Sequence, residues 1–297
     1  MATLSPYSKH FFTPEGSNNS WSNMYNFVPA GSRVLDVGCS TGNFGAALEE
    51  LKGCSVIGID INEQDIIEAR TKISEAYVLD ITQPNVAEQL GLFDAIIFAD
   101  VIEHLVDPRA ALRATHALLA EDGLVVYSIP HMGHMSVRLD LLEGRFPYTE
   151  LGLLDRTHLH FYDRLEVHDV FSSAGFRIVG ERPTVSSYPQ QWIDERLAAL
   201  GLTATPTFYQ QLQHTEADVY QYIGAAAPDQ AGPLVPAPSR KEISPPDEIL
   251  ERASEVLAEN QRLSDALIAL QSRVRELKKN PVGALARELK RRMGKNN

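Results

Sequence analysis

Residues 34–45 (Val-Leu-Asp-Val-Gly-Cys-Ser-Thr-Gly-Asn-Phe-Gly) constrain the fold of this 297-residue chain more than any other segment. The apolar residues at its start suit a short buried strand, and an amphipathic helical pattern begins at Phe44. Gly38 and Gly42 lie between the two and permit a sharp backbone turn. A strand, a glycine-bearing turn and a helix N-terminus in this order bring backbone N–H groups against a nucleotide-like ligand.

The acidic residue in this segment narrows the choice of ligand. The carboxylate of Asp36, two residues before the first glycine, would repel a pyrophosphate and would suit a cationic ligand. The spacing also fails the dinucleotide pattern G-x-G-x-x-G, because Ser40 stands in the place of the second glycine. The loop therefore favours an aminoacyl-type nucleoside over NAD.

Strand-like runs and helical patterns alternate from about residue 33 to residue 227. The expected strands are Arg33–Val37, Ser55–Asp60, Ala76–Leu79, Phe93–Ala99, Gly123–Ile129, Phe176–Glu181 and Asp218–Ala225. The expected helices are Phe44–Leu51, Glu63–Lys72, Pro108–Ala120 and Arg164–Ala174, with Asn62, Asp107 and Asp163 as N-caps. This alternation predicts an α/β fold with a Rossmann-like, mostly parallel, seven-stranded sheet covered on both faces. The last run, Asp218–Ala225, is expected to be an antiparallel edge strand.

Acidic residues follow the next two strands as well. Asp60 ends the second strand, 22 residues after Gly38, where a carboxylate can accept both ribose hydroxyls. Asp80 follows the third strand and can accept from an adenine amino group. With Asp36 and the glycines, these carboxylates are expected to face one crevice at the carboxyl ends of the strands, where open α/β sheets bind ligands.

On these residues the chain resembles the class I S-adenosylmethionine-dependent methyltransferases over about residues 30–227. The resemblance implies that Asp36 anchors the loop and the methionyl ammonium, and that Asp60 and Asp80 hold the ribose and the adenine. The segment after the fourth strand is similar to the one that borders the cofactor in the family. The cofactor-binding residues that the resemblance implies are Asp36, Gly38, Ser40, Gly42, Asp60, Ile61, Asp80, Ile81, Asp100 and Val101.

The catalytic requirement is small, because the methyl group of the cofactor is already activated. The enzyme must align the acceptor, exclude water and remove a proton. An alcohol acceptor needs a base, and histidine suits that role. We predict His104 and His158 as catalytic, with Asp155 orienting a histidine and Arg156 available for an acidic acceptor. His131 and His134 are weaker candidates for the base, and no cluster with metal-ligand spacing is present in the sequence.

The acceptor is less well defined than the cofactor. Residues 128–158 resemble bacterial methyltransferases associated with surface-polysaccharide synthesis, which suggests a sugar or glycan hydroxyl. Ubiquinone-type O-methyltransferases share the plan around Asp100–His104, so a quinone- or phenol-type small molecule is the alternative. A third interpretation is an inactive methyltransferase-like scaffold, which the intact set of acidic residues disfavours.

Charge and composition restrict the partners and the compartment. The net charge of −12 combines a tail of +6 in residues 278–297 with −18 in the rest of the chain, which argues against a broad nucleic-acid interface. Two cysteines, Cys39 and Cys54, give no disulfide framework, and no signal peptide or membrane-spanning run is expected. We therefore expect a cytoplasmic protein, with a membrane-surface contact through the basic tail as one alternative.

The domain organisation follows from changes in pattern. Residues 1–32 are expected to cap a methyltransferase domain at 33–227, which carries insertions at 130–162 and 183–214. A linker rich in proline and alanine at 228–247 then precedes a seven-residue apolar repeat at 248–280 and a basic amphipathic segment at 281–297. The repeat predicts a parallel coiled-coil homodimer, with Asn260 at an a position. Such a tail also suits docking beside a glycosyltransferase partner or on the inner face of a membrane.

Overall fold

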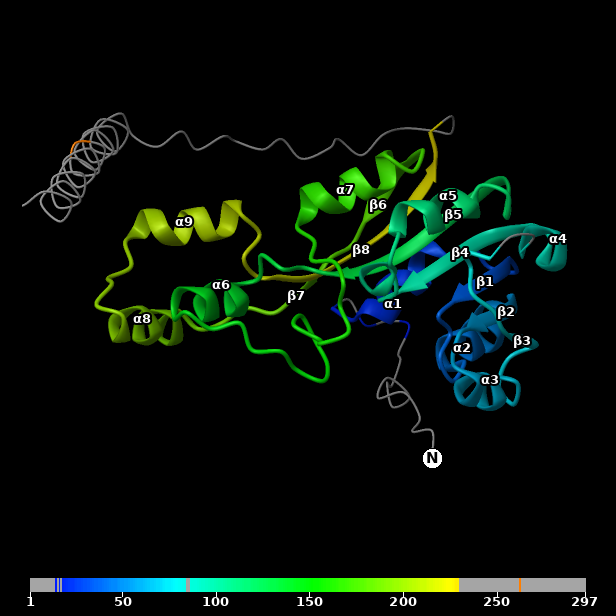
Figure 1. Cartoon of the computed structure of the whole chain (residues 1–297), viewed down its shortest axis with the longest axis horizontal. Helices are drawn as coiled ribbons and strands as arrows, with labels where there is room; N and C mark the ends of the chain where they lie inside the picture. The colour runs from blue at the N-terminus through cyan, green and yellow to red at the C-terminus, as the bar shows by residue number, and fades with distance from the viewer. Residues whose placement is uncertain (1–13, 15, 17, 84–85, 230–261, 263–297) are drawn as a thin grey trace, which may run out of the picture. The chain divides into compact units, whose positions relative to one another are not determined.

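The computed structural model describes residues 14, 16, 18–83, 86–229 and 262. Within them, eight strands form one sheet in the order β3-β2-β1-β4-β5-β8-β6, with β7 paired to β8 (Figure 1). The strands are β1 (Arg33–Val37), β2 (Ser55–Asp60), β3 (Glu75–Val78), β4 (Phe93–Ala99), β5 (Leu119–Pro130), β6 (Phe176–Glu181), β7 (Thr184–Val185) and β8 (Val219–Pro228). The predicted α/β fold is confirmed, and the two-residue β7 raises the number of strands from the expected seven to eight.

The direction of the strands agrees with the predicted mostly parallel sheet. Strands β3, β2, β1, β4 and β5 pair in parallel. The predicted antiparallel strand is β8, which pairs antiparallel with β5 on one side and with β6 on the other. Its predicted position at the edge is wrong, because β6 pairs with its outer side and ends the sheet there. Strand β8 therefore reaches the carboxyl end of β5 with its first residues, a position that matters for the site described below.

Helices cover both faces of the sheet, as predicted. The helices are α1 (Ser20–Phe27), α2 (Asn43–Lys52), α3 (Glu63–Ala69), α4 (Val86–Leu90), α5 (Pro108–Thr115), α6 (Met135–Leu142), α7 (Arg164–Ser172), α8 (Gln190–Ala199) and α9 (Pro206–His214). Alternate strand residues face opposite layers. Leu35 and Phe98 belong to a core with α4, α5 and α7, whereas Val34 and Ile97 belong to a core with α1, α2 and α3.

The predicted N-caps are confirmed, because the side chains of Asn62, Asp107 and Asp163 each accept a hydrogen bond from the first turn of α3, α5 and α7. The predicted C-terminus of α5 is wrong. The helix ends at Thr115, and β5 already begins at Leu119. The amphipathic pattern after Pro108 continued into the strand, because both elements bury apolar residues against the same layer.

The two predicted insertions fold together beside the sheet. Helix α6 comes from the first insertion, and α8 and α9 come from the second. Their side chains Met135, Leu139, Ile193 and Leu197 form a small separate core with Ala217, and residues of α9 pack against it. Figure 1 shows α6, α8 and α9 grouped beyond the end of β8, away from α2 and α3.

The predicted linker, coiled coil and basic tail at 228–297 lie outside the described residues, apart from residues 228, 229 and 262. Among the described helices, none has both the length and the apolar character needed to span a bilayer. The chain divides into two units, 1–239 and 240–297, and all the elements named above belong to the first.

Candidate active site

The loop after β1 turns back at once over the end of β2. The backbone N–H groups of Gly38 and Cys39 both donate to the carbonyl oxygen of Ile59. Gly38 has a φ of +70°, and a Cβ at this position would lie 2.6 Å from Cγ2 of Val101, in the loop after β4. Only glycine fits there, because a side chain would both strain the backbone and push the two loops apart. The loops after β1 and β4 therefore meet at the carboxyl ends of the parallel strands, which form one edge of the sheet.

The carboxylate of Asp60 holds this turn, and that of Asp36 is buried. The Oδ2 atom of Asp60 accepts the N–H of Ser40 at 3.0 Å, and its Oδ1 atom accepts the N–H of Asn62 at 2.9 Å. Ser40 has a φ of +46°, so this hydrogen bond supports a backbone conformation that a non-glycine residue rarely adopts. Asp36 is 2% exposed, and its burial, with a smaller effect from Asp60, raises its pKa to about 7. In the free protein, Asp36 is therefore close to half protonated at neutral pH.

The end of β3 supplies a more open part of the same edge. The carboxylate of Asp80 accepts hydrogen bonds from the N–H and the hydroxyl of Thr82, at 2.8 and 2.7 Å. The side chain of Ile81 is buried in the core, whereas Ile61, directly after β2, is 78% exposed. An apolar side chain at the rim, beside two carboxylates, fits a ligand that has both a flat apolar ring and hydroxyl groups.

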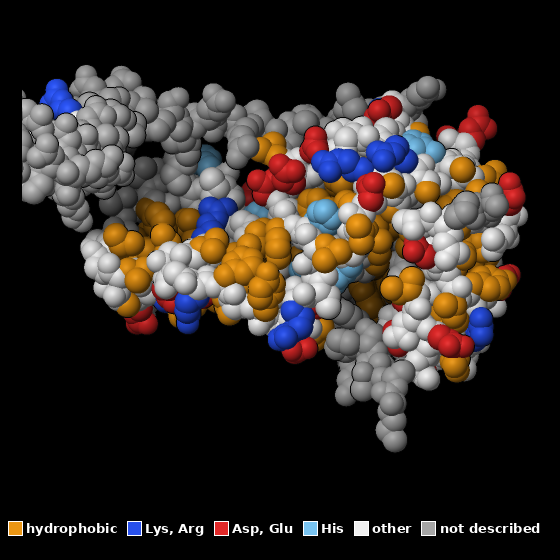
Figure 2. All heavy atoms as spheres, in the orientation of Figure 1, with side chains coloured by type: hydrophobic (Ala, Val, Ile, Leu, Met, Phe, Trp, Pro, Cys, Tyr) orange, Lys and Arg blue, Asp and Glu red, His pale blue; other side chains and the backbone are white. Residues whose placement is uncertain are grey.

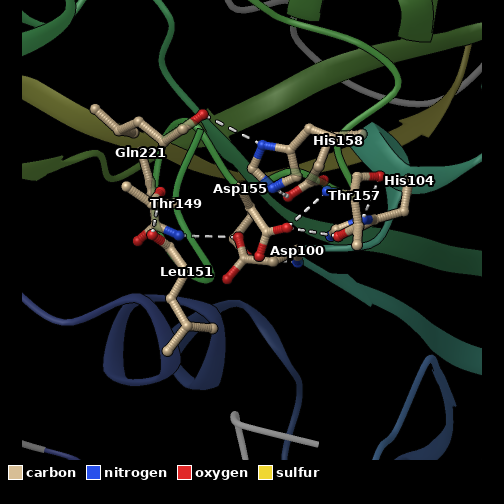
Figure 3. Close-up of polar contacts among 11 residues, drawn as sticks. Asp100, His104, Thr149, Leu151, Asp155, Thr157, His158 and Gln221 are labelled. Atoms are coloured by element: carbon tan, nitrogen blue, oxygen red, sulfur yellow. Dashed lines mark hydrogen bonds and ion pairs between the residues drawn. The ribbon is translucent and has the colours of Figure 1, made fainter. Parts of the chain in front are cut away.

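The residue after β4 is held in a strained conformation. Asp100 has a φ of +53°, and its N–H donates to the carbonyl and the hydroxyl oxygen of Ser128, at 3.2 and 3.0 Å. The Oδ1 atom of Asp100 in turn accepts from the Ser128 hydroxyl at 2.8 Å and from Nε2 of Gln221 at 2.9 Å. Strain of this kind persists where surrounding contacts fix it, and it is concentrated at functional sites. Figure 3 shows Asp100 and Gln221 close to the loop that carries Asp155.

These residues fit the expected cofactor. Four acidic residues, Asp36, Asp60, Asp80 and Asp100, lie at the carboxyl ends of β1 to β4, where the pairing of the parallel strands places them along one edge. The negative charge of these carboxylates suits an ammonium or sulfonium group. The structure thus brings the implied cofactor-binding residues to one edge, with the side chain of Ile81 turned into the core.

His104 lies at the end of a short 3₁₀ turn (Ile102–His104), and its contacts determine its tautomer. Its Nδ1 atom lies 3.1 Å from both the carbonyl oxygen and the hydroxyl oxygen of Thr157. That hydroxyl donates its proton to Oδ1 of Asp155 at 2.6 Å (Figure 3). Both Thr157 oxygens are therefore acceptors toward His104, so Nδ1 carries the proton. The lone pair is then on Nε2, which is the arrangement that a general base requires.

His158 packs beside His104 with a ring-centroid distance of 4.8 Å, but its surroundings differ. Its Nδ1 lies 3.2 Å from the carbonyl oxygen of Leu153, to which it can only donate. Its Nε2 lies 3.9 Å from Oε1 of Glu103, too far for a hydrogen bond. Burial, and secondarily His104, lower the pKa of His158, and burial raises that of Glu103 well above its usual value. Burial therefore favours the neutral form of both groups.

Three other sequence candidates have structural roles. Nδ1 of His131 lies 3.0 Å from the carbonyl oxygen of Val219, and burial lowers the pKa of His131 to about 4. His134 caps the N-terminus of α6 and contacts the carbonyl oxygen of Ser186 through Nε2 at 2.8 Å. Arg156, proposed for an acidic acceptor, pairs instead with Glu150 at 2.8 Å. Among the candidates for a base, the contacts therefore favour His104.

The structure assembles one three-donor group that the sequence spacing did not indicate. Among the described residues, ligand atoms of Glu103, His104 and His158 lie within 4.8 Å of one another. Zinc ligands at about 2.0–2.1 Å from the metal lie closer together than that limit, so the side chains would have to move to bind it. The prediction of no metal therefore stays a prediction.

The sequence also missed Thr157, Glu103, Ser128 and Gln221. Glu103 and Ser128 had a usable signal, because Ser128 stands at the carboxyl end of an expected strand and Glu103 lies in the loop that follows another. Thr157 and Gln221 had none. They reach the site only because residues 149–158 fold back on the 3₁₀ turn and because β8 runs antiparallel beside β5.

Comparison with known proteins provides an independent view. Residues 21–181 match the model of a family described as a methyltransferase domain. A ubiquinone biosynthesis O-methyltransferase of Pseudomonas aeruginosa (strain LESB58) is 36% identical over 104 residues, which cover 33% of this chain and 44% of that protein. The protein of the same name from Ruegeria pomeroyi is 30% identical over 168 residues, covering 55% of this chain and 66% of that protein.

The match to the first of these relatives therefore spans less than half of its length. Among solved structures, a SAM-dependent methyltransferase from Archaeoglobus fulgidus aligns with 18% sequence identity and a TM-score of 0.49. That alignment covers 69% of this chain and 91% of the other.

Proposed function

The chain belongs to the methyltransferase domain family of S-adenosylmethionine-dependent enzymes, and we propose from this that it methylates a hydroxyl oxygen of a small organic acceptor. The relatives named ubiquinone biosynthesis O-methyltransferases support a ring hydroxyl of the quinone or phenol type. They favour this alternative over the sugar hydroxyl that the sequence suggested first, for which the comparisons give no support. The observation that carries the proposal is the contact between His104 and Thr157, which leaves Nε2 of a partly exposed histidine free to accept a proton.

The cofactor would lie along the edge formed by the loops after β1 to β4. Asp36 would hold its ammonium, the turn at Gly38 its amino-acid portion, and Asp60 and Asp80 its ribose and adenine. When bound, S-adenosylmethionine supplies an activated methyl group. The protein must therefore position the acceptor, exclude water and take up one proton.

His104 would take up that proton at Nε2. A neutral imidazole becomes cationic when it accepts a proton, and the carboxylate of Asp155 stabilises the cation through the Thr157 hydroxyl. The same two hydrogen bonds fix the orientation of the ring before the reaction. His158 and Glu103 are buried, whereas His104 is partly exposed. We therefore expect His158 and Glu103 to support the wall of the acceptor site and not to take up the proton.

We expect Asp60→Ala to weaken binding of S-adenosylmethionine at least about tenfold, because the substitution removes a charged acceptor and frees the N–H of Ser40. Isothermal titration of the full chain measures the dissociation constant. Asp122→Ala is the matched control, since Asp122 is an exposed aspartate near the start of β5. Equal affinities of the wild type and Asp60→Ala would contradict the proposed cofactor site.

The acceptor class is tested by transfer of a labelled methyl group. Catechols and simple phenols are expected to be methylated, whereas nucleotide sugars and polyprenyl-linked glycans are not. Methylation of a sugar with no transfer to any phenol would overturn the small-molecule proposal and restore the sugar interpretation. No transfer to either class, with cofactor binding intact, would favour the scaffold interpretation.

The assembly of the chain is a separate proposal. We infer a parallel homodimer from the heptads at 248–280, with the basic segment at 281–297 available to a membrane surface or a glycosyltransferase. Removal of residues 247–297 is expected to turn a dimer into a monomer in light scattering and to leave cofactor affinity unchanged. A dimer that survives the deletion would place the interface in the catalytic domain.

A further inference from the structure

The segment between α6 and α7 exposes aromatic side chains that contact one another. The ring of Phe146 lies edge-to-face with those of Tyr148 and Phe161, at centroid distances of 5.4 and 5.7 Å. These three side chains, here called the aromatic shelf, are 36%, 54% and 37% exposed. Figure 2 shows hydrophobic side chains gathered over this part of the chain. Apolar groups gathered on a surface in this way mark an interaction site more often than single exposed residues do.

A row of neighbouring rings joins the aromatic shelf to the candidate active site. The ring of Phe161 meets that of His158 at a centroid distance of 6.4 Å, and His158 meets His104 at 4.8 Å. An acceptor with its hydroxyl at His104 therefore has two surroundings: the acidic, polar edge of the sheet on one side and the aromatic shelf on the other.

The charges around the aromatic shelf are neutralised in pairs. Arg145 contacts Asp140 and Glu143 at 2.9 and 2.6 Å, and Arg156 contacts Glu150 at 2.8 Å. These arginines are occupied by carboxylates of α6 and of the same segment, so they give no preference for an anionic ligand. An anionic membrane surface is attracted by unpaired basic residues, which this segment does not offer among its described residues. The charge pattern suits an uncharged, apolar group.

We propose that the aromatic shelf binds an uncharged apolar substituent of the acceptor, such as an alkyl group on the hydroxyl-bearing ring. The proposal rests on the proposed function, because the hydroxyl of the same molecule lies at His104. It makes the acceptor amphipathic, with the polar end in the site and the hydrocarbon on Phe146, Tyr148 and Phe161. Specificity would then grow with the apolar area that the substituent covers.

The probe is a homologous series of 4-alkylphenols, from 4-methylphenol to 4-octylphenol, titrated into the full chain in the presence of S-adenosylhomocysteine. Full burial of one methylene would raise the affinity about fourfold. An open surface covers about half of the alkyl group, so we expect the affinity to rise about twofold per methylene. Tyr148→Ala and Phe161→Ala are expected to reduce this dependence to less than about 1.3-fold per methylene. Tyr77→Ala is the control, since Tyr77 is 41% exposed on β3, at the other end of the sheet.

Two results would overturn the proposal: an affinity that does not depend on chain length in the wild type, or a dependence that survives in both aromatic-shelf variants while they remain folded by circular dichroism. Sedimentation with phosphatidylcholine vesicles provides a further test. Loss of vesicle binding in Tyr148→Ala and Phe161→Ala, with alkylphenol binding unchanged, would assign the surface to membranes and also overturn it.

The outcome is distinguishable from that of the proposed function. If catechol is methylated and alkyl substituents do not change the rate, the proposed function stands and the proposed role of the aromatic shelf is wrong. Chain-length-dependent binding without methyl transfer to any phenol would keep the aromatic shelf and remove the function.

Discussion

Replacement of His104 by glutamine is expected to lower kcat about 100- to 10,000-fold, while the dissociation constant for S-adenosylmethionine stays within about twofold of the wild type. Glutamine keeps a polar side chain of similar length, but it cannot take up the proton of the acceptor hydroxyl. The cofactor is expected to bind at the edge formed by the loops after β1 to β4, so its affinity reports separately on the integrity of that edge. Steady-state kinetics with the best acceptor of the labelled-methyl screen measures the first quantity, and calorimetry measures the second.

His214→Gln is the matched control, because His214 is exposed at the C-terminal end of α9. We expect it to leave both quantities unchanged. Wild-type turnover in His104→Gln would remove His104 as the base and would direct attention to His158, the other histidine of the pair.

The role of Thr157 is separated from packing by two substitutions. Thr157→Val keeps the shape of the side chain and removes the hydroxyl that connects His104 to Asp155, and Thr157→Ser keeps that hydroxyl. We expect valine to lower kcat at least about tenfold with little change in KM, because the imidazolium loses its hydrogen-bonded link to the carboxylate. Serine is expected to restore most of the rate. Equal losses in the two variants would show that Thr157 only packs.

Four strands of the sheet were predictable to the residue from local sequence, because their own residues determine them. Strands β1, β2, β4 and β6 begin and end at the expected residues. Their apolar positions alternate because the two faces of the sheet bury different cores. The glycine turn was equally local, since the positive φ of Gly38 follows from its place between a strand and a helix.

The contacts inside the site were not predictable in the same way. Asp155 was expected to orient a histidine directly, but the hydrogen bonds that reach His104 pass through Thr157. Residues 149–158 close on themselves, for example through the N–H of Thr149 and the carbonyl oxygen of Leu154. The next N–H groups then donate to the carbonyl oxygen of Glu103. The contact between His104 and Thr157, about 50 positions apart, forms only because this segment folds back onto the 3₁₀ turn. No periodicity in the sequence encodes that fold.

Binding of S-adenosylmethionine is expected to strengthen as the pH rises from 5.5 toward 7.5. Burial raises the pKa of Asp36 to about 7 in the free protein, whereas a cationic ligand requires the carboxylate. At pH 5.5 only about 3% of the protein would have Asp36 ionised, so the apparent affinity would be about 30-fold below its limit at high pH. The α-amino group of the ligand has a pKa near 8, so it stays largely protonated through this range.

Asp36→Asn distinguishes this cause from a general effect of pH. Asparagine cannot ionise, so the variant is expected to bind weakly and with nearly constant affinity between pH 5.5 and 7.5. Calorimetry in buffers of different ionisation enthalpy supplies a second measurement: the wild type is expected to release protons on binding at pH 6.5, and Asp36→Asn is not. The same pKa has an opposite consequence for folding. Because folded Asp36 holds its proton more tightly than unfolded Asp36, its contribution to the stability of the free protein falls as the pH rises from about 4 to about 7. The ionised carboxylate thus destabilises the free protein, and binding of the cation offsets this cost. An affinity for S-adenosylmethionine that does not change with pH in the wild type would show that Asp36 does not face the charge of the ligand.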